Sequence, residues 1–255
     1  MGKIMILHPM CEGADFARDL LAGNEDVEVV SLDRGPAIIR SEMDYALAGL
    51  DCVKKAREAE KAGYEAIILT CHGDPNLYPL REAVRIPVLG CTQVAMHLCS
   101  LLARRFSILV PHELFTKRSK EDAIARYGFG SKIASIRQVS FEVPLDEVAE
   151  LSRRRPIPEG IIGPVLNEAI KAIEEDDATA ITFGCLFMGM LGDELRGQLR
   201  DRGFDVLVVN TLPMALEVAR LLVRNKLTHS ALAFPLAEHY ELRGDEAKEE
   251  AIHRP

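Results

Sequence analysis

The segments AGYEAIILTC (62–71) and DDATAITFGC (176–185) share one pattern: a polar stretch, a short run rich in apolar residues, and a terminal cysteine. Short apolar runs bounded by polar residues predict buried strands. Two further pairs match in the same order at a similar separation. They are MILHP (5–9) with SILVP (107–111), and IPVLGCTQVAMHLCSLL (86–102) with VLVVNTLPMALEVARLL (206–222). Three ordered matches indicate an internal repeat, so we predict two topologically similar halves.

Eight short β-rich runs alternate with longer amphipathic or charged stretches, which predicts an α/β fold. Each half is expected to form a lobe with a mostly parallel four-stranded sheet and helices on both faces, and a pseudo-two-fold axis relates the lobes. Residues 1–103 and 211–255 are assigned to lobe 1, with a returning C-terminal helix, and residues 104–210 to lobe 2. The strands are predicted at Lys3 to Leu7, Val27 to Leu32, Ala66 to Thr70, Pro87 to Gly90, Phe106 to Val110, Ile133 to Val139, Ala180 to Phe183 and Val206 to Val209.

The composition is that of an acidic globular protein: 255 residues, 48% apolar, with a formal net charge of −8. Because a phosphate backbone is bound by basic patches, nucleic acid is not an expected partner. The apolar run in MGKIMILHPMC (1–11) is too short for a membrane span, and we expect a cytoplasmic protein. The charged, poorly periodic segment EHYELRGDEAKEEAIHRP (238–255) is expected to be a solvated helix or tail.

Six cysteines occur without the dense spacing of a disulfide scaffold, so free thiols are expected. Cys91, His97 and Cys99 form no CxxC pair, and a helix would scatter them over different faces, so no metal site is expected. Organic cofactors are not indicated either.

Cys71 and Cys185 occupy matching positions at the carboxyl ends of two predicted strands, where open parallel sheets bind ligands. If the lobes face each other, the two thiols reach one active site from opposite sides. Two groups of similar basicity across a substrate can remove a proton from one face of a carbon and return one to the other. A free thiol has a pKa of ~8.5, and a helix N-terminus with nearby N–H groups could lower it toward about 7.

The residues after each cysteine predict such a helix start. Asp74 is a suitable N-cap and Pro75 a suitable first helical residue, while LFMGMLGDELRGQL (186–199) gives a glycine-punctuated loop that enters a helix. His72 adjoins Cys71, but consecutive residues of an extended strand point to opposite sides. We therefore expect His72 to line the pocket and not to act as the base for Cys71.

At this point the sequence resembles the aspartate/glutamate/hydantoin racemase superfamily, most closely its hydantoin and allantoin racemase branch. The resemblance covers nearly the whole chain and is most specific at CHGDP (71–75), which resembles the branch's Cys-Phe-Gly-Asp-Pro, and at FGCLFMG (183–189), which resembles its Gly-Cys-Ala-Gly-Met. It implies a cofactor-independent racemase or epimerase with Cys71 and Cys185 as acid/base thiols. It further implies a small-molecule substrate, held largely by backbone N–H groups between the lobes, and a homo-oligomer.

The chain departs from that branch where the substrate is expected. Leu7-His8-Pro9-Met10 stands in place of Ile-Asn-Pro-Asn, and Ile38-Ile39-Arg40 in place of Ser-Ile-Glu. These changes weaken the assignment of a hydantoin as substrate more than they weaken the assignment of racemase chemistry. Either Arg40 or His8 could bind a carboxylate of the substrate. The expected substrate-binding residues are His8, Met10, Cys11, Ile39, Arg40, Thr70, His72, Gly73, Gly184, Leu186 and Phe187.

Two alternatives remain open at the level of sequence. The same fold could carry a maleate-type cis-trans isomerase or a decarboxylase, in which one cysteine acts alone. A two-lobed ligand-binding protein without turnover would also fit, because a fold does not determine a function. The substrate is either a hydantoin-like ureide or an amino-acid-like compound.

Overall fold

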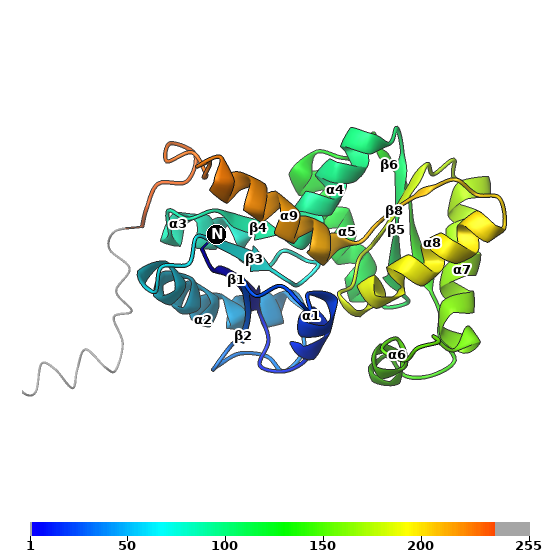
Figure 1. The fold of residues 1–255 in the computed structure, drawn as a ribbon, viewed down its shortest axis with the longest axis horizontal. Coiled ribbons are helices and arrows are strands. Elements are labelled where there is room, and N and C mark those ends of the chain that lie inside the picture. The colour runs from blue at the N-terminus through cyan, green and yellow to red at the C-terminus, as the bar shows by residue number, and fades with distance from the viewer. Residues whose placement is uncertain (1, 238–255) are drawn as a thin grey trace, which may run out of the picture.

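The structure is a computed structural model that describes residues 2–237; the segment 238–255, for which a solvated helix or tail is expected, lies outside the described residues. Two four-stranded sheets have the orders β2-β1-β3-β4 and β6-β5-β7-β8, and every neighbouring pair is parallel. The second order repeats the first strand for strand, so the predicted two-lobed α/β fold is confirmed (Figure 1). The strands are β1 (Ile4–His8), β2 (Val27–Ser31), β3 (Ala66–Leu69), β4 (Val88–Gly90), β5 (Phe106–Pro111), β6 (Ile133–Val139), β7 (Ala180–Phe183) and β8 (Leu207–Val209).

Helices cover both faces of each sheet (Figure 1). In lobe 1, α2 and α3 pack on one face and α1 and α9 on the other. In lobe 2, α7 and α8 pack on one face and α4 and α5 on the other. The helices are α1 (Asp15–Leu20), α2 (Glu42–Lys61), α3 (Leu77–Ala83), α4 (Cys91–Leu102), α5 (Leu114–Tyr127), α6 (Leu145–Leu151), α7 (Glu159–Glu174), α8 (Gly192–Asp201), α9 (Thr211–Arg224) and the 3₁₀ helix η1 (Phe187–Leu191).

The central strands are apolar on both sides because both of their faces are covered. Every residue of β1, β3, β5 and β7 is buried, whereas most residues of the edge strands β2 and β6 are only partly buried. Continuous apolar runs of this kind are the signature of parallel strands between helix layers. The same signature explains why the central strands could be located from the sequence.

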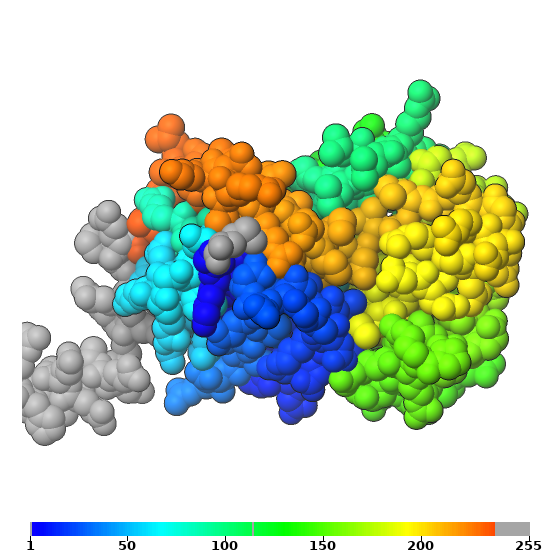
Figure 2. All heavy atoms as spheres, in the orientation of Figure 1, coloured from blue at the N-terminus to red at the C-terminus, as the bar shows by residue number. Residues whose placement is uncertain are grey.

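Two helices each follow a strand of one lobe but pack in the core of the other lobe. Helix α4 follows β4 of lobe 1, but its Met96 and Cys99 lie in a core cluster with β5, β7 and β8 of lobe 2. Helix α9 follows β8 of lobe 2, but its Leu212 and Leu216 lie in a cluster with β1 and β3 of lobe 1. Figure 2 shows the orange surface of α9 lying directly on the blue and cyan surface of lobe 1. The assignment of 1–103 and 211–255 to one lobe stays a prediction, and α4 contributes to both cores.

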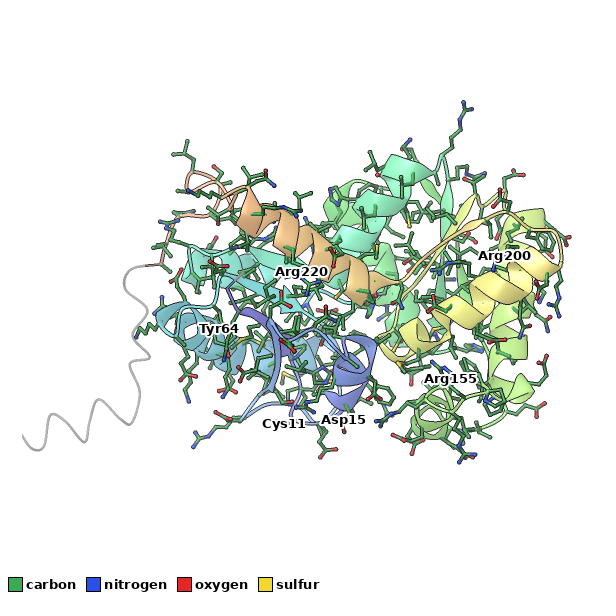
Figure 3. All side chains as sticks on the ribbon, viewed as in Figure 1. Cys11, Asp15, Tyr64, Arg155, Arg200 and Arg220 are labelled. Atoms are coloured by element: carbon green, nitrogen blue, oxygen red, sulfur yellow. The ribbon has the colours of Figure 1, made fainter. Side chains whose placement is uncertain are left out.

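Arg220 fixes the outer side of α9 to lobe 1 (Figure 3). Its guanidinium donates to Asp26 Oδ2 at 3.1 Å and to Asn24 Oδ1 at 2.8 Å, both in the turn before β2. The Arg220 side chain is 19% exposed and the Asp26 side chain 18%. Because the pair is partly buried, solvent screens it less than an exposed pair.

The helix that follows Cys71 begins later than the sequence predicted. Asp74 has a positive φ of 47°, Asn76 has a φ of 57°, and α3 begins only at Leu77 without a side-chain cap. The prediction of Asp74 as the N-cap and Pro75 as the first residue of this helix was therefore wrong. Within residues 2–237 no helix is long and apolar enough to span a membrane.

Candidate active site

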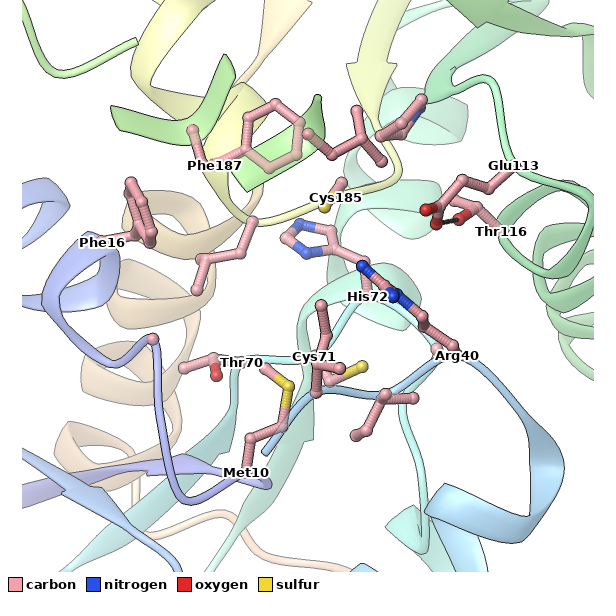
Figure 4. A pocket seen from close by; sticks show the side chains of 18 of the residues that line it. Met10, Phe16, Arg40, Thr70, Cys71, His72, Glu113, Thr116, Cys185 and Phe187 are labelled. Atoms are coloured by element: carbon pink, nitrogen blue, oxygen red, sulfur yellow. Dashed lines mark hydrogen bonds between the residues drawn. The ribbon is translucent and has the colours of Figure 1, made fainter. Parts of the chain in front are cut away.

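One cavity of about 590 Å³ is lined by residues from both lobes (Figure 4). In Figure 4 Cys71 enters from the cyan strand of lobe 1 and Cys185 from the yellow loop of lobe 2. The cavity lining includes both cysteines and ten of the eleven expected substrate-binding residues: His8, Met10, Ile39, Arg40, Thr70, His72, Gly73, Gly184, Leu186 and Phe187. The remaining one, Cys11, does not line it; its thiol faces the Gly35 carbonyl at 3.5 Å.

Equivalent hydrogen bonds set the positions of the two cysteines. The Thr70 N–H donates to the Leu7 carbonyl at 3.1 Å, and the Gly184 N–H donates to the Leu109 carbonyl at 2.8 Å. Each bond extends the pairing of two central strands by one residue, and each cysteine follows directly. Both thiols are free and partly exposed.

Cys71 is surrounded by groups that favour its thiolate. Burial raises the pKa of its thiol, while the Gly73 N–H, the Lys120 ammonium and the Tyr45 hydroxyl lower it. The N–H that faces the sulfur thus belongs to the second residue after the cysteine. The N-terminus of α3 does not add to it, because α3 begins six residues after Cys71.

Cys185 has a similar but poorer set of partners. Burial raises the pKa of its thiol to about 12, with a further rise from Cys71, while the Phe187 N–H and Lys120 oppose the increase. The expected N–H donors are present at both cysteines. The expected net lowering of the thiol pKa was wrong, because burial in the closed-in cavity outweighs the donors.

Gly73 allows Tyr45 to lie against the Cys71 loop. A Cβ at position 73 would lie 1.5 Å from the Tyr45 hydroxyl and 3.1 Å from Ser119 Oγ. The Tyr45 hydroxyl in turn hydrogen-bonds to Ser119 Oγ at 3.1 Å, and its ring packs edge-on against Phe115. Tyr45 therefore connects α2 of lobe 1 to α5 of lobe 2 beside Cys71.

Lys120 of α5 lines the same cavity and is only 1% exposed. Its aliphatic stem crosses Gly184, where a Cβ would lie 2.9 Å from Lys120 Cε and 2.5 Å from Val110 Cγ1. Burial lowers the pKa of Lys120, and Cys71, Asp74 and Cys185 oppose that decrease.

His72 is buried and bonded away from Cys71. Its Nε2 pairs with the Thr211 hydroxyl at the start of α9, and its Nδ1 has no hydrogen-bond partner among the described residues. Burial, followed by the charge of Lys120, lowers the pKa of His72 to about 3, so the imidazole is neutral. A pocket-lining role for His72 agrees with this geometry.

His8 and Arg40 differ in their availability to a ligand. Both ring nitrogens of His8 are occupied, Nδ1 by the Thr70 hydroxyl at 2.8 Å and Nε2 by the Glu12 carbonyl at 2.7 Å. Burial lowers the pKa of His8 to about 4. The His8 imidazole is therefore neutral and cannot form an ion pair with a carboxylate. Arg40 is exposed, and Figure 4 shows its side chain extending into the pocket.

Asp74 is a cap, but of a different helix from the one expected. Its carboxylate accepts from the N–H groups of Thr92 at 3.1 Å and Gln93 at 2.8 Å, in the first turn of α4. The Tyr127 hydroxyl of α5 donates to it at 2.8 Å. Burial raises the pKa of Asp74, and these three donors hold it down.

The sequence reasoning missed the contribution of α5 to the cavity. Phe115, Thr116, Ser119 and Lys120 line it, together with Tyr45 of α2. Positions 116, 119, 120 and 123 share one helical face, and Ala123 on that face is buried. Because Thr116, Ser119 and Lys120 are polar, no apolar stripe in the sequence marks this face as the inner one. Within residues 2–237 no group of three histidine, cysteine or acidic side chains is arranged to hold a metal ion.

The chain matches a known protein family over most of its length. The family model described as Asp/Glu/Hydantoin racemase matches residues 14–219. The chain belongs to this family and is an isomerase of the racemase class.

Known proteins resemble it over most of their length. A hydantoin racemase from Pseudomonas sp. (strain NS671) is 31% identical over 203 residues, which cover 77% of this chain and 78% of the relative. The structure of an allantoin racemase from Klebsiella pneumoniae matches with a TM-score of 0.80 at 25% identity, covering 96% of this chain and 97% of that one. An arylmalonate decarboxylase shares the fold alone, with a TM-score of 0.58 at 18% identity, covering 88% of this chain and 93% of that one.

Proposed function

We propose that the protein is a cofactor-independent racemase or epimerase that moves a proton at a carbon alpha to a carbonyl, with Cys71 and Cys185 as its two acid/base groups. One observation carries the proposal: two free thiols that follow equivalent strands of the two lobes line one cavity. A single cysteine would suffice for a reaction on one face of the substrate, whereas inversion needs a proton carrier on each face.

In the proposed reaction one thiolate removes the proton from the substrate carbon, and the electron pair moves into the adjacent carbonyl to give an enolate. The opposite thiol then donates its proton to the other face of the same carbon. The first cysteine ends as a thiol and the second as a thiolate, so atoms and charge balance. For the opposite enantiomer the two cysteines exchange roles.

The proposed substrate is a hydantoin-like ureide or an amino-acid-like compound. The names of the relatives, hydantoin racemase and allantoin racemase, favour a cyclic ureide. The exposed guanidinium of Arg40 supplies a donor at the cavity, whereas the Gly73 and Phe187 N–H groups already face the two sulfurs. His8 is replaced as a candidate carboxylate partner by Arg40, because both His8 nitrogens are already bonded.

A screen in heavy water tests the proposal. 5-Substituted hydantoins, allantoin and amino acids are incubated with the protein, and loss of the α-proton is followed by NMR while optical rotation is followed in parallel. We expect Cys71→Ser and Cys185→Ser each to abolish racemisation, although either variant can still exchange the proton of one enantiomer. Cys99→Ala, a buried cysteine of α4 outside the cavity, is the matched control and stays active.

Full racemisation by both serine variants would exclude the two-thiol scheme. Carbon dioxide release from a malonate would instead indicate the decarboxylase alternative, and a covalent adduct on Cys71 during turnover would indicate the cis-trans isomerase. A ligand recovered unchanged and without deuterium would indicate a binding protein.

We also propose a cytoplasmic homo-oligomer. The six free cysteines fit a reducing compartment.

On α2, Met43, Leu47 and Leu50 are 67%, 57% and 53% exposed at positions that share one helical face. An apolar face of this kind favours a subunit contact. Size-exclusion chromatography with light scattering would show a monomer if this proposal is wrong.

A further inference from the structure

Lys120 is a buried cation without a conventional partner. It is 1% exposed, and no hydrogen bond or ion pair joins its ammonium to another residue in the described range. An ammonium is almost never buried unless it is paired, because removing it from water is costly. A negatively charged group at the cavity would therefore stabilise the charged form of Lys120.

Two glycines bring α5 against both cysteine loops. Lys120 Cε lies 2.9 Å from the site of a Cβ on Gly184, the residue before Cys185. Ser119 Oγ lies 3.1 Å from the site of a Cβ on Gly73, two residues after Cys71. Adjacent residues of one helix thus contact both loops, and Lys120, Cys71 and Cys185 all line the cavity between them.

Asp74 is the other negative group near Lys120, and together with the thiols it opposes the decrease in the pKa of Lys120. It does not line the cavity, and its carboxylate accepts from three donors, two of them in the first turn of α4. His72 is neutral, and Arg126 on the same helix is another cation. At the cavity itself, the negative charges that act on Lys120 are the ionised forms of the two thiols.

The two thiols differ in the hydrogen-bond donors that surround them. Cys71 has two hydrogen-bond donors, the Gly73 N–H and the Tyr45 hydroxyl, in addition to Lys120. Cys185 has one donor, the Phe187 N–H. Each thiol also faces one carboxylate that opposes its ionisation, Asp74 for Cys71 and Glu113 for Cys185, so the difference lies in the number of donors. The surroundings therefore favour ionisation of Cys71 over Cys185.

We propose that Lys120 is the counter-cation of the thiol pair, that it makes Cys71 the first of the two to ionise, and that Cys71 is the base of the unliganded enzyme. The proposal rests on the two-thiol function proposed above. Lys120 acts through the thiols and not on the substrate, so it is a positioning residue. After Cys71 has taken the substrate proton and Cys185 has given its own proton to the product, the same ammonium neutralises the thiolate of Cys185.

Alkylation of the thiols tests this without a substrate. The folded protein is treated with iodoacetamide from about pH 5.5 to about pH 10.5, a range that brackets an ordinary thiol. Because the pKa of Cys185 is raised to about 12, a midpoint above this range is read as labelling that still increases with pH at the upper limit. Peptide mass spectrometry resolves the rates at Cys71 and Cys185. We expect a lower midpoint for Cys71 in the wild-type protein. Lys120→Met should raise that midpoint by about one unit or more, a decrease of roughly tenfold in rate below the midpoint, because a nearby opposite charge shifts a pKa by ~1–3 units.

Three further variants complete the test. Lys120→Arg keeps the charge and should restore most of the wild-type midpoint. Lys117→Met, one turn earlier on α5 and outside the cavity lining, should leave both midpoints unchanged. Tyr45→Phe removes a donor to Cys71 alone, so it should raise the Cys71 midpoint and not that of Cys185. It also keeps the proposal testable if Lys120→Met does not fold, as judged by circular dichroism.

Unchanged midpoints in Lys120→Met and Tyr45→Phe would overturn the proposal, as would a lower midpoint for Cys185 than for Cys71 in the wild-type protein. Since alkylation needs no substrate, a shifted midpoint upholds the role of Lys120 even if the heavy-water screen finds no turnover. An unchanged midpoint overturns that role even if both cysteines prove essential.

Discussion

Replacing Gly73 with alanine should force Tyr45 or the Cys71 loop out of position. The new Cβ would lie 1.5 Å from the Tyr45 hydroxyl oxygen and 2.4 Å from its Cζ. Ordinary contact begins near about 3.5 Å, so one of the two groups must move by roughly 2 Å. Either movement also carries a donor away from the Cys71 sulfur, since the Gly73 N–H and the Tyr45 hydroxyl both face it.

The structure sets the size of the effect. If Tyr45 moves, it loses the 3.1 Å hydrogen bond to Ser119 and the edge-on contact with Phe115, whose ring centroid is 5.5 Å away. These two interactions together are worth about 2 kcal/mol. If the loop moves instead, overpacking of a tight site costs ~1–3 kcal/mol. We therefore expect Gly73→Ala to lower the free energy of unfolding by about 2 kcal/mol.

Urea unfolding measures this loss, and iodoacetamide labelling of Cys71 measures the disturbance of its donors. At m-values of ~2 kcal/mol per molar urea, the midpoint falls by about 1 M. Gly197→Ala is the matched control, because a Cβ there meets nothing within 4 Å and position 197 lies inside α8. That alanine should stabilise the helix by ~1 kcal/mol.

A double-mutant cycle separates the steric cause from other effects. In a Tyr45→Ala background the clash is gone, so adding Gly73→Ala should cost less than about 0.5 kcal/mol, and the coupling between the two positions should exceed ~1 kcal/mol. A Gly73→Ala variant with the wild-type urea midpoint and the wild-type rate of Cys71 labelling would refute the described packing of Tyr45 against this loop.

Two further predictions concern stability. Burial lowers the pKa of His8 to about 4 and of His72 to about 3, so the unfolded chain takes up their protons near pH 6.5 and the folded chain does not. Their contribution is complete above pH ~6.5 and falls as the pH drops, by roughly 2 kcal/mol per histidine at pH ~5. The loss of stability between pH ~7 and pH ~5, measured from urea midpoints, should therefore be about 2 kcal/mol smaller in His72→Phe than in the wild-type protein; an equal loss in both proteins would contradict this. Asp74→Ala leaves three buried or partly buried donors unpaired and should cost about 4 kcal/mol, whereas Asp74→Asn, which keeps one acceptor oxygen, should cost about half as much. Similar losses in the two variants would show that the carboxylate is not the cap of α4.

The parts of the fold that could be predicted depend on local sequence. The central strands are apolar because helices cover both faces, and Cys71 and Cys185 could be paired because each ends such a run. The cavity then follows from the rule that ligands bind at the carboxyl ends of parallel strands.

What escaped prediction depends on packing between distant segments. Asp74 has the residue type of a cap, but the helix it caps begins 17 positions later than itself, at Cys91, and only the folded chain shows this. In the sequence, Lys120 belongs to the charged segment TKRSKED (116–122), which predicts an exposed side chain. Its burial arises only when α5 packs against Gly184 in the folded chain. The upward shift of the thiol pKa values likewise arises from enclosure by both lobes.

The packing of α4 and α9 on the opposite lobes also affects the order in which the two lobes can fold during synthesis on the ribosome. The core of lobe 1 includes Leu212, Ala215, Leu216 and Ala219, so it stays incomplete until α9 has been synthesised, although its first strand is made at the very beginning. Lobe 2 receives Met96 and Cys99 from a helix that precedes it and has all its strands once Val209 has emerged. Domains commonly fold from the N-terminus as the chain is made. In this chain we expect the C-terminal half to finish first, with the N-terminal half waiting for its last helix.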